Sequence, residues 1–395
     1  MGYGSISQLK MDRGIAVKKR TKLLAALMMC CLLLVGCAGP GGSAGGTTAD
    51  TDPTTSPEVT TGRPVTDDRE ETRYSYQFKN RWKTGVTAVV EDGNRTINLR
   101  VVEIDIPGDG DDIEIFQITD VHFSFYYEDE SQYVKNSFAE WGNLTREDGS
   151  PVDHNATVET FRSCVNYAAD SDCIVVTGDL SNFYSQANLD CIENYIFQAK
   201  TYINPEMRAK MIAVCGNHDA TLRDYRTANA VYLQNRENLK NLFSKYNQSM
   251  EYFSYLIDER VMVVQLDNAS GYDIGEPRFS EAQRLALERD VALAKEKGYT
   301  MLLFCHVPLP SRNSEDAYTN YDAAAYQFDA NTKAVYDIIT NHAEVIRGIF
   351  AGHAHQDAYS ELVAHTSEGR KAFVPQYVLK ALYTGDGDMV KIVLQ

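Results

Sequence analysis

Five short motifs carry the side chains of this chain that can do acid–base or metal chemistry, and each follows an apolar run. They hold five of its eight histidines. In chain order the motifs are Asp120-Val-His122, Gly178-Asp179, Gly216-Asn-His-Asp219, His306 and Gly352-His-Ala-His355. Imidazoles and carboxylates are ligands that suit ions such as Mn, Fe and Zn. The motifs therefore predict a metal site of the kind that hydrolyses phosphate esters.

A pair of metal ions needs a bridging carboxylate, further oxygen and nitrogen ligands, and open positions. Asp120 and His122 stand two residues apart at the end of a predicted strand, so both side chains can point to one side. Gly178 has no side chain, which lets Asp179 approach a cluster closely. Asn217 offers a neutral amide oxygen. The later motifs add three imidazoles: His306, His353 and His355.

The spacing of apolar residues indicates the strands that must position these motifs. Apolar runs that lead into a motif predict strands at Ile113–Ile118, Cys173–Val176, Met211–Cys215, Met301–Cys305 and Val345–Phe350. A further strand is predicted at Val261–Leu266, which ends in Asp267 without a metal motif. Alternating residues between Arg73 and Ile106 predict two half-buried strands joined by the turn Glu91-Asp-Gly-Asn.

Helical periodicity fills the gaps between these strands. The predicted helices are Val158–Ala169, Leu189–Thr201, Ser280–Lys297 and Ala330–His342. Thr157 and Ser280 are expected N-caps, and Gln283 fits a capping box with Ser280. Strands that alternate with helices indicate a mainly parallel sheet, whose ligand binds beyond the carboxyl ends of the strands. All five motifs lie there.

In this order the motifs resemble those of the calcineurin-like metallophosphoesterase superfamily. The resemblance covers roughly residues 113–360 and includes Phe279-Ser-Glu-Ala-Gln283 ahead of His306. It implies an α/β fold, a four-layer α/β/β/α sandwich with the metal site at the C-terminal ends of the strands. It also implies a metal-dependent phosphoric ester hydrolase that acts on small-molecule phosphate mono- or diesters.

The resemblance gives each motif residue a role. Metal one would be held by four residues: Asp120, His122, Asp179 and His355. Metal two would share the bridging Asp179 and take three more: Asn217, His306 and His353. A hydroxide between the ions would attack phosphorus in line with the ester oxygen. His218 would act as the general acid for the leaving oxygen, and Asp219 would orient His218 and favour its charged form.

One position departs from a branch of this superfamily. Purple acid phosphatases carry a Tyr ligand three residues after the bridging Asp, and here that position is Asn182. Mn, Zn or ferrous iron are therefore as plausible as ferric iron. The stretches Cys305–Pro310 and Gly352–Tyr359 resemble the purple-acid-phosphatase-like branch that lacks this Tyr.

Substrate contacts are less clear from the sequence. Aromatic residues gather between His122 and Asp179, and either pack a long loop onto the domain or face a nucleoside base or sugar: Phe123, Phe125, Tyr126, Tyr127, Tyr133 and Trp141. Three arginines beyond the motifs are candidate phosphate contacts or solvated surface residues: Arg223, Arg226 and Arg312. No catalytic role is expected for the histidines outside the motifs: His154, His342 and His365.

The N-terminal segment indicates export. Basic residues from Lys18 to Lys22 precede an uncharged run, Leu23–Val35, which is shorter than the roughly 20 residues that span a bilayer. Leu34-Val-Gly-Cys37 resembles the lipobox of bacterial lipoproteins and implies a diacylglycerol anchor on Cys37, with an ordinary signal peptide as the alternative. We therefore expect a lipoprotein signal peptide at 1–36 and anchoring on the extracellular face of the bacterial membrane.

Composition divides the rest of the chain into a linker and a domain. Residues 37–72 are rich in Gly, Thr, Ser and Pro and bury too little apolar surface to fold. Residues 73–395 are expected to form one domain. Without residues 1–36 the chain carries 32 basic and 54 acidic residues, a net charge of −22, which argues against nucleic acid as a partner. No protein partner is implied.

Five cysteines remain in the domain: Cys164, Cys173, Cys191, Cys215 and Cys305. Their odd number and irregular spacing do not indicate a disulfide framework. Cys173, Cys215 and Cys305 lie in the apolar runs that lead into motifs, and we expect buried apolar roles for them rather than metal-binding thiolates. The alternative to an enzyme is a lipid-anchored surface binding protein with an inactive site. Every expected ligand type is present in the five motifs, which favours the enzyme.

Overall fold

The computed structural model describes residues 88–92, 95–146, 148–222, 230–269, 278–311, 329–384 and 387–395. The predicted signal peptide, Cys37 and the linker lie outside these residues, so their assignment stays a prediction. No helix in the described part of the chain has both the length and the apolar character needed to cross a membrane.

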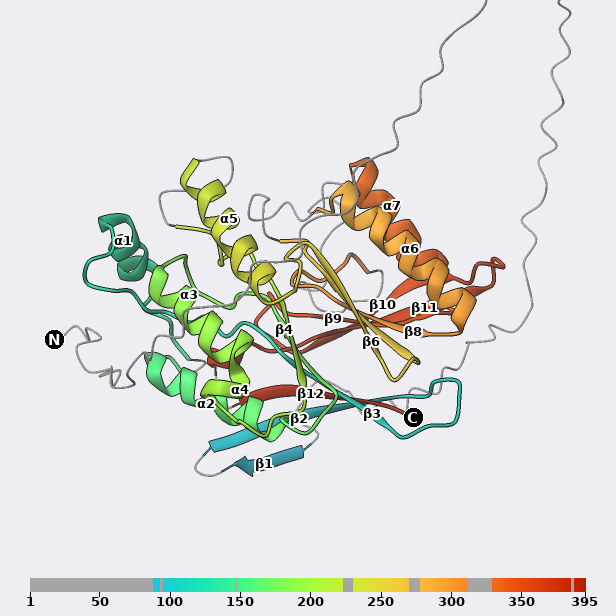
Figure 1. The fold of residues 1–395 in the computed structure, drawn as a ribbon, viewed down its shortest axis with the longest axis horizontal. Coiled ribbons are helices and arrows are strands. Elements are labelled where there is room, and N and C mark those ends of the chain that lie inside the picture. The colour runs from blue at the N-terminus through green and yellow to red at the C-terminus, as the bar shows by residue number, and fades with distance from the viewer. Residues whose placement is uncertain are drawn as a thin grey trace, which may run out of the picture. The chain divides into compact units, whose positions relative to one another are not determined.

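Two six-stranded sheets form the centre of the described fold (Figure 1). In spatial order, the strands of the first sheet are β1 (Ala88–Asp92), β2 (Arg95–Ile104), β12 (Gly387–Leu394), β3 (Ile113–Ile118), β4 (Cys173–Thr177) and β5 (Lys210–Val214). Those of the second sheet are β10 (Ala358–His365), β11 (Lys371–Val378), β9 (Ile346–Ala351), β8 (Thr300–Phe304), β7 (Val261–Leu266) and β6 (Tyr252–Ile257). Strands β3 to β5 are parallel, as are β7, β8, β9 and β11.

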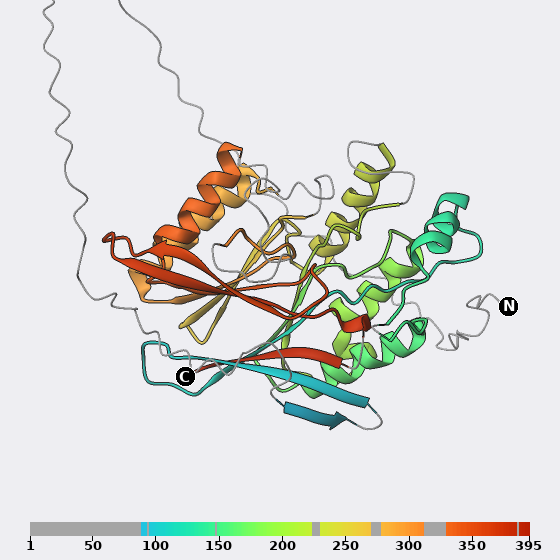
Figure 2. The same ribbon diagram turned by 180° about the vertical axis from the view of Figure 1, so that it is seen from behind.

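Helices cover the outer face of each sheet (Figures 1 and 2). On the first sheet and around its carboxyl end the chain forms α1 (Gln132–Trp141), α2 (His154–Tyr167), α3 (Gln186–Ile192), the π-helix η1 (Glu193–Phe197), α4 (Ala199–Tyr202) and α5 (Ala230–Lys245). Helices α6 (Glu281–Lys297) and α7 (Ala330–Asn341) lie side by side on the second sheet. A short 3₁₀ helix, η2 (Leu382–Thr384), precedes β12.

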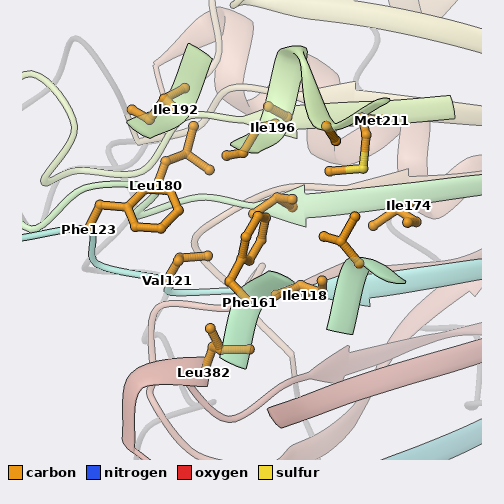
Figure 3. Close-up of a cluster of buried hydrophobic side chains, with 14 of the residues drawn as sticks. Ile118, Val121, Phe123, Phe161, Ile174, Leu180, Ile192, Ile196, Met211 and Leu382 are labelled. Carbon is orange, nitrogen blue, oxygen red and sulfur yellow. The ribbon is translucent and has the colours of Figure 1, made fainter. Parts of the chain in front are cut away.

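Three clusters of buried hydrophobic side chains separate these layers. One lies between helices and the first sheet and includes Phe161 of α2 with Ile118 and Ile174 of the strands (Figure 3). A second lies between α6, α7 and the second sheet. The third joins the two sheets face to face. The order helix, sheet, sheet, helix confirms the predicted four-layer α/β/β/α sandwich.

This layering explains why the strands before the motifs are apolar without interruption. Along β4, Val175 faces the space between the sheets, whereas its neighbours Ile174 and Val176 face the helices. Successive side chains of a strand point to opposite faces, so a strand covered on both faces needs apolar residues at every position. The strands predicted ahead of the motifs are found within a residue of their expected ends, and they are divided between the two sheets of the sandwich.

Three details of the predicted helices need correction: the start of α2, the capping box of α6 and the bounds of the helix predicted at Leu189–Thr201. Helix α2 begins at His154 because the carboxylate of Asp153, not the hydroxyl of Thr157, accepts from the first free amides of the helix. Ser280 does cap α6 by accepting from Gln283 N, but Gln283 donates to the Asp267 carbonyl oxygen instead of closing a capping box. The helix predicted at Leu189–Thr201 starts earlier and is interrupted by the π-helix η1.

The cysteines behave as buried apolar residues. Cys173, Cys215 and Cys305 are free and buried in the strands or just beyond their ends. Burial raises the pKa of the Cys305 thiol to about 12, so it stays protonated at neutral pH.

Candidate metal centre

The five motifs lie at the carboxyl ends of five strands that come from both sheets. Strands β3, β4 and β5 of the first sheet lead into Asp120, Asp179 and Asn217. Strands β8 and β9 of the second sheet lead into His306 and His353. Side chains from distant parts of the sequence therefore meet at one edge of the sandwich.

The backbone turns sharply at most of the candidate ligands. Five of them have φ between 44° and 68°, a left-handed conformation that non-glycine residues rarely adopt: Asp120, His122, Asp179, His353 and His355. Two main-chain hydrogen bonds hold the first of these turns, from Asp120 N to Gly178 O (3.1 Å) and from His122 N to Asp179 O (2.9 Å). Strained backbone of this kind, on the order of 1–3 kcal/mol per residue, is typical of ligand sites.

Close approach of the loops requires glycine at three positions. A Cβ atom on Gly178 would lie 2.2 Å from Nδ1 of His306, one on Gly216 would lie 2.1 Å from Oδ1 of Asp179, and one on Gly352 would lie 1.9 Å from Oγ1 of Thr119. None of these contacts is sterically possible. Gly178 and Gly352 let the ligand loops of the two sheets come together, and Gly216 does the same for two neighbouring loops of the first sheet.

The first group of candidate ligands comprises Asp120, His122, Asp179 and His355, whose donor atoms all lie within 4.8 Å of one another. Nε2 of His122 lies 3.2 Å from Nε2 of His355 and 3.5 Å from Oδ2 of Asp179. Nε2 of His355 lies 3.2 Å from Oδ1 of Asp120. Ligand atoms bound at about 2.0–2.2 Å from one ion have mutual distances of this size.

The second group comprises Asp179, His306 and His353, with Asn217 beside them. Nε2 of His306 lies 3.3 Å from Oδ2 of Asp179, 3.2 Å from Oδ1 of Asn217 and 3.2 Å from Nδ1 of His353. The same carboxylate oxygen, Oδ2 of Asp179, thus faces both groups. Its partner Oδ1 accepts from the main-chain N–H of His218 at 3.0 Å.

One buried carboxylate oxygen fits a cation directly. Oδ2 of Asp120 accepts from Thr119 Oγ1 (2.7 Å) and His353 N (2.9 Å). Oδ1 of Asp120 is buried and accepts no hydrogen bond from the described residues, and imidazole nitrogens surround it. A buried acceptor left without a partner is costly, and a metal ion would satisfy it. The donor set therefore suits the ions predicted from the sequence.

The pKa values of the candidate ligands depend on how their buried charges interact. Burial opposes protonation of His306, but the negative charge of Asp179 beside it raises the pKa of His306 to about 10. Burial, together with the charge of His306, lowers the pKa of His353 to about 3. Burial alone would favour a neutral Asp179, yet the adjacent histidines hold its pKa well below the usual range. The site is therefore built around an ionised carboxylate that attracts positive charge.

His218 lies beside the two groups and is oriented by the main chain. Its Nδ1 donates to the main-chain oxygen of Asn182 at 2.9 Å. The ring packs edge-to-face against His122 and Trp141, with centroid distances of 5.2 and 5.8 Å. Nε2 is then the nitrogen available to a substrate.

The predicted role of Asp219 in orienting His218 has no hydrogen bond behind it among the described residues, because the Asp219 carboxylate accepts from other groups. Its Oδ1 accepts from Ser181 N and its Oδ2 accepts from Gly216 N, each at 2.7 Å. Burial and the nearby charge of Asp179 raise the pKa of Asp219 to about 7. Asp219 thus connects the loops after β4 and β5 by hydrogen bonds. The main-chain oxygen of Asn182, and not Asp219, orients His218.

The aromatic residues between His122 and Asp179 mostly pack the domain. Phe123 and Phe125 are buried in the core of the first sheet. Tyr126 and Trp141 contact a small separate cluster under helix α1. Tyr127 donates to Asp190 at 2.7 Å. The packing alternative is correct for these residues, and Trp141 in addition contacts His218.

Several predicted residues do not belong to the described site. Arg223, Arg226 and Arg312 lie outside the described residues, so their contact with phosphate stays a prediction. His154 is hydrogen-bonded to Gly142 O at 2.7 Å, and His342 lies 3.3 Å from Glu344. Neither histidine belongs to the two groups of candidate ligands.

Three residues that support the candidate ligands were not predicted from the sequence: Tyr383, Arg100 and Asp357. The hydroxyl of Tyr383 lies 2.9 Å from Nδ1 of His355. Arg100 of β2 donates to Asp357, two residues beyond His355. The sequence around Arg100 gives no indication of this contact, because its partner Asp357 lies 257 positions away. Tyr383 lies outside every motif, so no sequence pattern connects it with His355.

Comparisons with known proteins find similarity only among solved structures. No protein-family profile matches the chain, and no curated protein matches it. A dimetal phosphatase from Danio rerio is 15% identical, with a TM-score of 0.41 over 69% of this chain and 88% of its own. A purple acid phosphatase from yellow lupin (Lupinus luteus) seeds is 11% identical, with a TM-score of 0.40 over 74% and 47%. PhoD is 10% identical, with a TM-score of 0.42 over 72% and 60%. The function of the chain is therefore inferred from the side chains of the site and not from these similarities.

Proposed function

We propose that this protein is a two-metal phosphoesterase that hydrolyses phosphate mono- or diesters of small molecules. The observation that carries the proposal is the position of Asp179, whose Oδ2 lies 3.5 Å from Nε2 of His122 and 3.3 Å from Nε2 of His306. One carboxylate oxygen shared by two sets of ligands is the arrangement that a pair of ions needs.

Two ions of Mn, Fe or Zn suit this mixture of imidazole, carboxylate and amide donors. When bound, such ions supply an activated water and positive charge for the transition state. Asp120 and Asp179 offset only part of the charge of two dications, so a phosphate anion is attracted although the chain is acidic overall. Asn182 stands where a Tyr ligand would be, and its side-chain amide donates to the Trp141 carbonyl oxygen instead.

His218 has the orientation required of a general acid. Because its Nδ1 donates to a carbonyl oxygen, its Nε2 is left to hold a proton for the departing ester oxygen. Its main-chain N–H also donates to Asp179, so the acid and the shared carboxylate are fixed to each other. We propose that this coupling keeps the proton donor in line with the metal centre.

The proposed location is the extracellular face of a bacterial membrane, with the chain anchored through a lipid on Cys37. The lipobox-like residues 34–37 and the Gly/Thr/Ser/Pro-rich stretch that follows support it. A Cys37→Ser variant should leave the membrane fraction of cells that express it, whereas the unchanged chain should stay there after salt washing. Equal partitioning of both proteins would contradict the anchor.

Metal analysis combined with ester hydrolysis tests the activity. The protein freed of metal and reloaded with Mn²⁺, Zn²⁺ or Fe²⁺ should take up two ions and hydrolyse 4-nitrophenyl phosphate or bis(4-nitrophenyl) phosphate. The loss of hydrolysis on chelation should be reversed by adding the ion back. A protein that binds no ion and hydrolyses neither ester would favour the inactive, lipid-anchored binding protein.

A further inference from the structure

The 3₁₀ helix η2 joins the C-terminal segment to the metal centre. Leu382 N donates to the carbonyl oxygen of Thr119, the residue before Asp120, at 3.1 Å. The Leu382 side chain is buried in the cluster that contains Phe161 (Figure 3). Helix η2 is therefore anchored both to the core and to the loop that carries the first candidate ligands.

The next residue, Tyr383, contacts two histidines of the first group. Its hydroxyl lies 2.9 Å from Nδ1 of His355, and its ring packs edge-to-face on His355 and His122 at centroid distances of 5.2 and 4.8 Å. Tyr383 is only 8% exposed. Within each group the two histidines also pack on each other, His122 on His355 at 5.1 Å and His306 on His353 at 5.0 Å.

The two groups differ in what holds their imidazoles. Nδ1 of His306 donates to the main-chain oxygen of Thr177 at 3.0 Å, so the second group is oriented by a buried strand end. In the first group, Nδ1 of His122 is buried and has no hydrogen-bond partner among the described residues. Beyond the candidate ligands and His218, Tyr383 is therefore the residue in the described part of the chain that contacts the rings of both His122 and His355.

We infer that Tyr383 is a positioning residue for the first metal of the proposed centre, through a hydrogen bond to His355 and ring packing on His122. The inference rests on the proposed two-metal function. When Nε2 of His355 binds an ion, Nδ1 keeps its proton and donates to the phenol oxygen of Tyr383. The C-terminal segment thereby supports one of the two ions and leaves the other to the strands.

Two substitutions separate the two contacts that Tyr383 makes. Tyr383→Phe removes the hydrogen-bond acceptor and keeps the ring, whereas Tyr383→Leu removes both. Tyr359→Phe is the matched control, because the Tyr359 hydroxyl donates to Glu361 at 2.8 Å on strand β10. The two Tyr→Phe proteins keep a residue of similar size, so the fold should be retained, whereas Tyr383→Leu leaves a smaller side chain at a buried position and needs the stability control below.

Titration of the metal-free proteins with Mn²⁺ measures the effect, with stoichiometry from calorimetry and spin coupling from electron paramagnetic resonance. The unchanged protein and Tyr359→Phe should bind two coupled ions. In Tyr383→Phe the affinity of one ion should fall about 10- to 100-fold, as is usual when a partner of a metal-bound histidine is removed, while the other ion is bound as before. Tyr383→Leu should show a larger loss at the same ion.

Two results would overturn the inference. Tyr383→Phe and Tyr383→Leu could bind both ions with unchanged affinity, or they could lose both ions equally, which would indicate a general structural effect. If the proposed two-metal function itself were wrong, the result would be different, because the unchanged protein would then bind no pair of ions at all. Thermal melting of each metal-free variant distinguishes a change in folding from a change at the site.

Discussion

The main-chain oxygen of Asn182 accepts a hydrogen bond from Nδ1 of His218 at 2.9 Å. A carbonyl oxygen can only accept, so Nδ1 carries a hydrogen and Nε2 is the nitrogen that gains or loses a proton. Asn182 follows Asp179 by three residues in the loop after β4. A single loop therefore sets both the shared carboxylate and the imidazole proposed as the proton donor.

His218→Ala should retain both ions and lower the turnover rate by about 100-fold or more, the range expected for loss of a general acid. Metal retention is expected because the contact of His218 with Asp179 uses the main-chain N–H, which alanine keeps. The loss should be larger for an alkyl phosphate than for 4-nitrophenyl phosphate, whose leaving group hardly needs a proton. An equal loss for both esters would contradict proton donation.

The candidate ligands could be predicted from the sequence because each lies within a few residues of a strand end. Apolar runs such as Cys173–Thr177 locate the strands, and parallel neighbours then bring the motifs to one edge. The partner of His218 could not be predicted in this way. Asp219 is its neighbour in sequence, but Asn182 reaches it from another strand, and only the folded loops decide between them.

The strands at the C-terminus of the chain likewise could not be predicted from local sequence patterns. Strand β12 lies between β2 and β3, where Val390 pairs with Arg100 and with Gln117. Strand β12 carries Asp388 and Lys391 and leads into no motif, so the pattern that indicates the other strands does not locate it. Strands β10 and β11, which complete the second sheet, were also missed. Tyr383 arrives at the metal centre only because β12 returns to the middle of the first sheet.

Asp179→Asn should abolish binding of both ions, because Oδ2 is the one oxygen that faces both groups. Asp120→Asn is the matched comparison, since Asp120 belongs to the first group alone. It should lose one ion and keep the second. Metal content after gel filtration measures both outcomes. Two bound ions in Asp179→Asn, or equal losses in the two variants, would refute the bridging role.

Removal of the ions should lower the melting temperature. Without a cation, Asp120 keeps an unpaired buried oxygen, and the left-handed turns at five candidate ligands keep their strain. An ion present at 100 times its dissociation constant stabilises the folded state by about 2.7 kcal/mol, which corresponds to a shift of roughly 5 °C or more. Melting curves with chelator and with restored Mn²⁺ check this. Identical curves would show that the folded protein holds no ion.

Arg100→Met should destabilise the protein by about 3–5 kcal/mol, because it leaves two carboxylates without their buried cation. The Arg100 side chain is 3% exposed and pairs with Asp357 and Asp388. Arg208→Met is the control, since Arg208 is 73% exposed beside an exposed Asp170, and its loss should cost about 1 kcal/mol or less. Urea denaturation of the chelated proteins gives both values. Similar losses in the two variants would contradict a structural role for Arg100.

Gly216→Ala should lose both metal binding and stability. The φ angle of Gly216 is not left-handed, but a Cβ atom there would lie 2.1 Å from Oδ1 and 2.2 Å from the main-chain N of Asp179, so alanine displaces the shared carboxylate together with the loop after β4. Gly298→Ala is the comparison, since φ is 75° at the end of α6 and the space around it is open. That variant should lose about 1–2 kcal/mol of stability and keep both ions. Metal content and urea denaturation measure both outcomes, and metal binding that survives in Gly216→Ala would show that Asp179 is free to move.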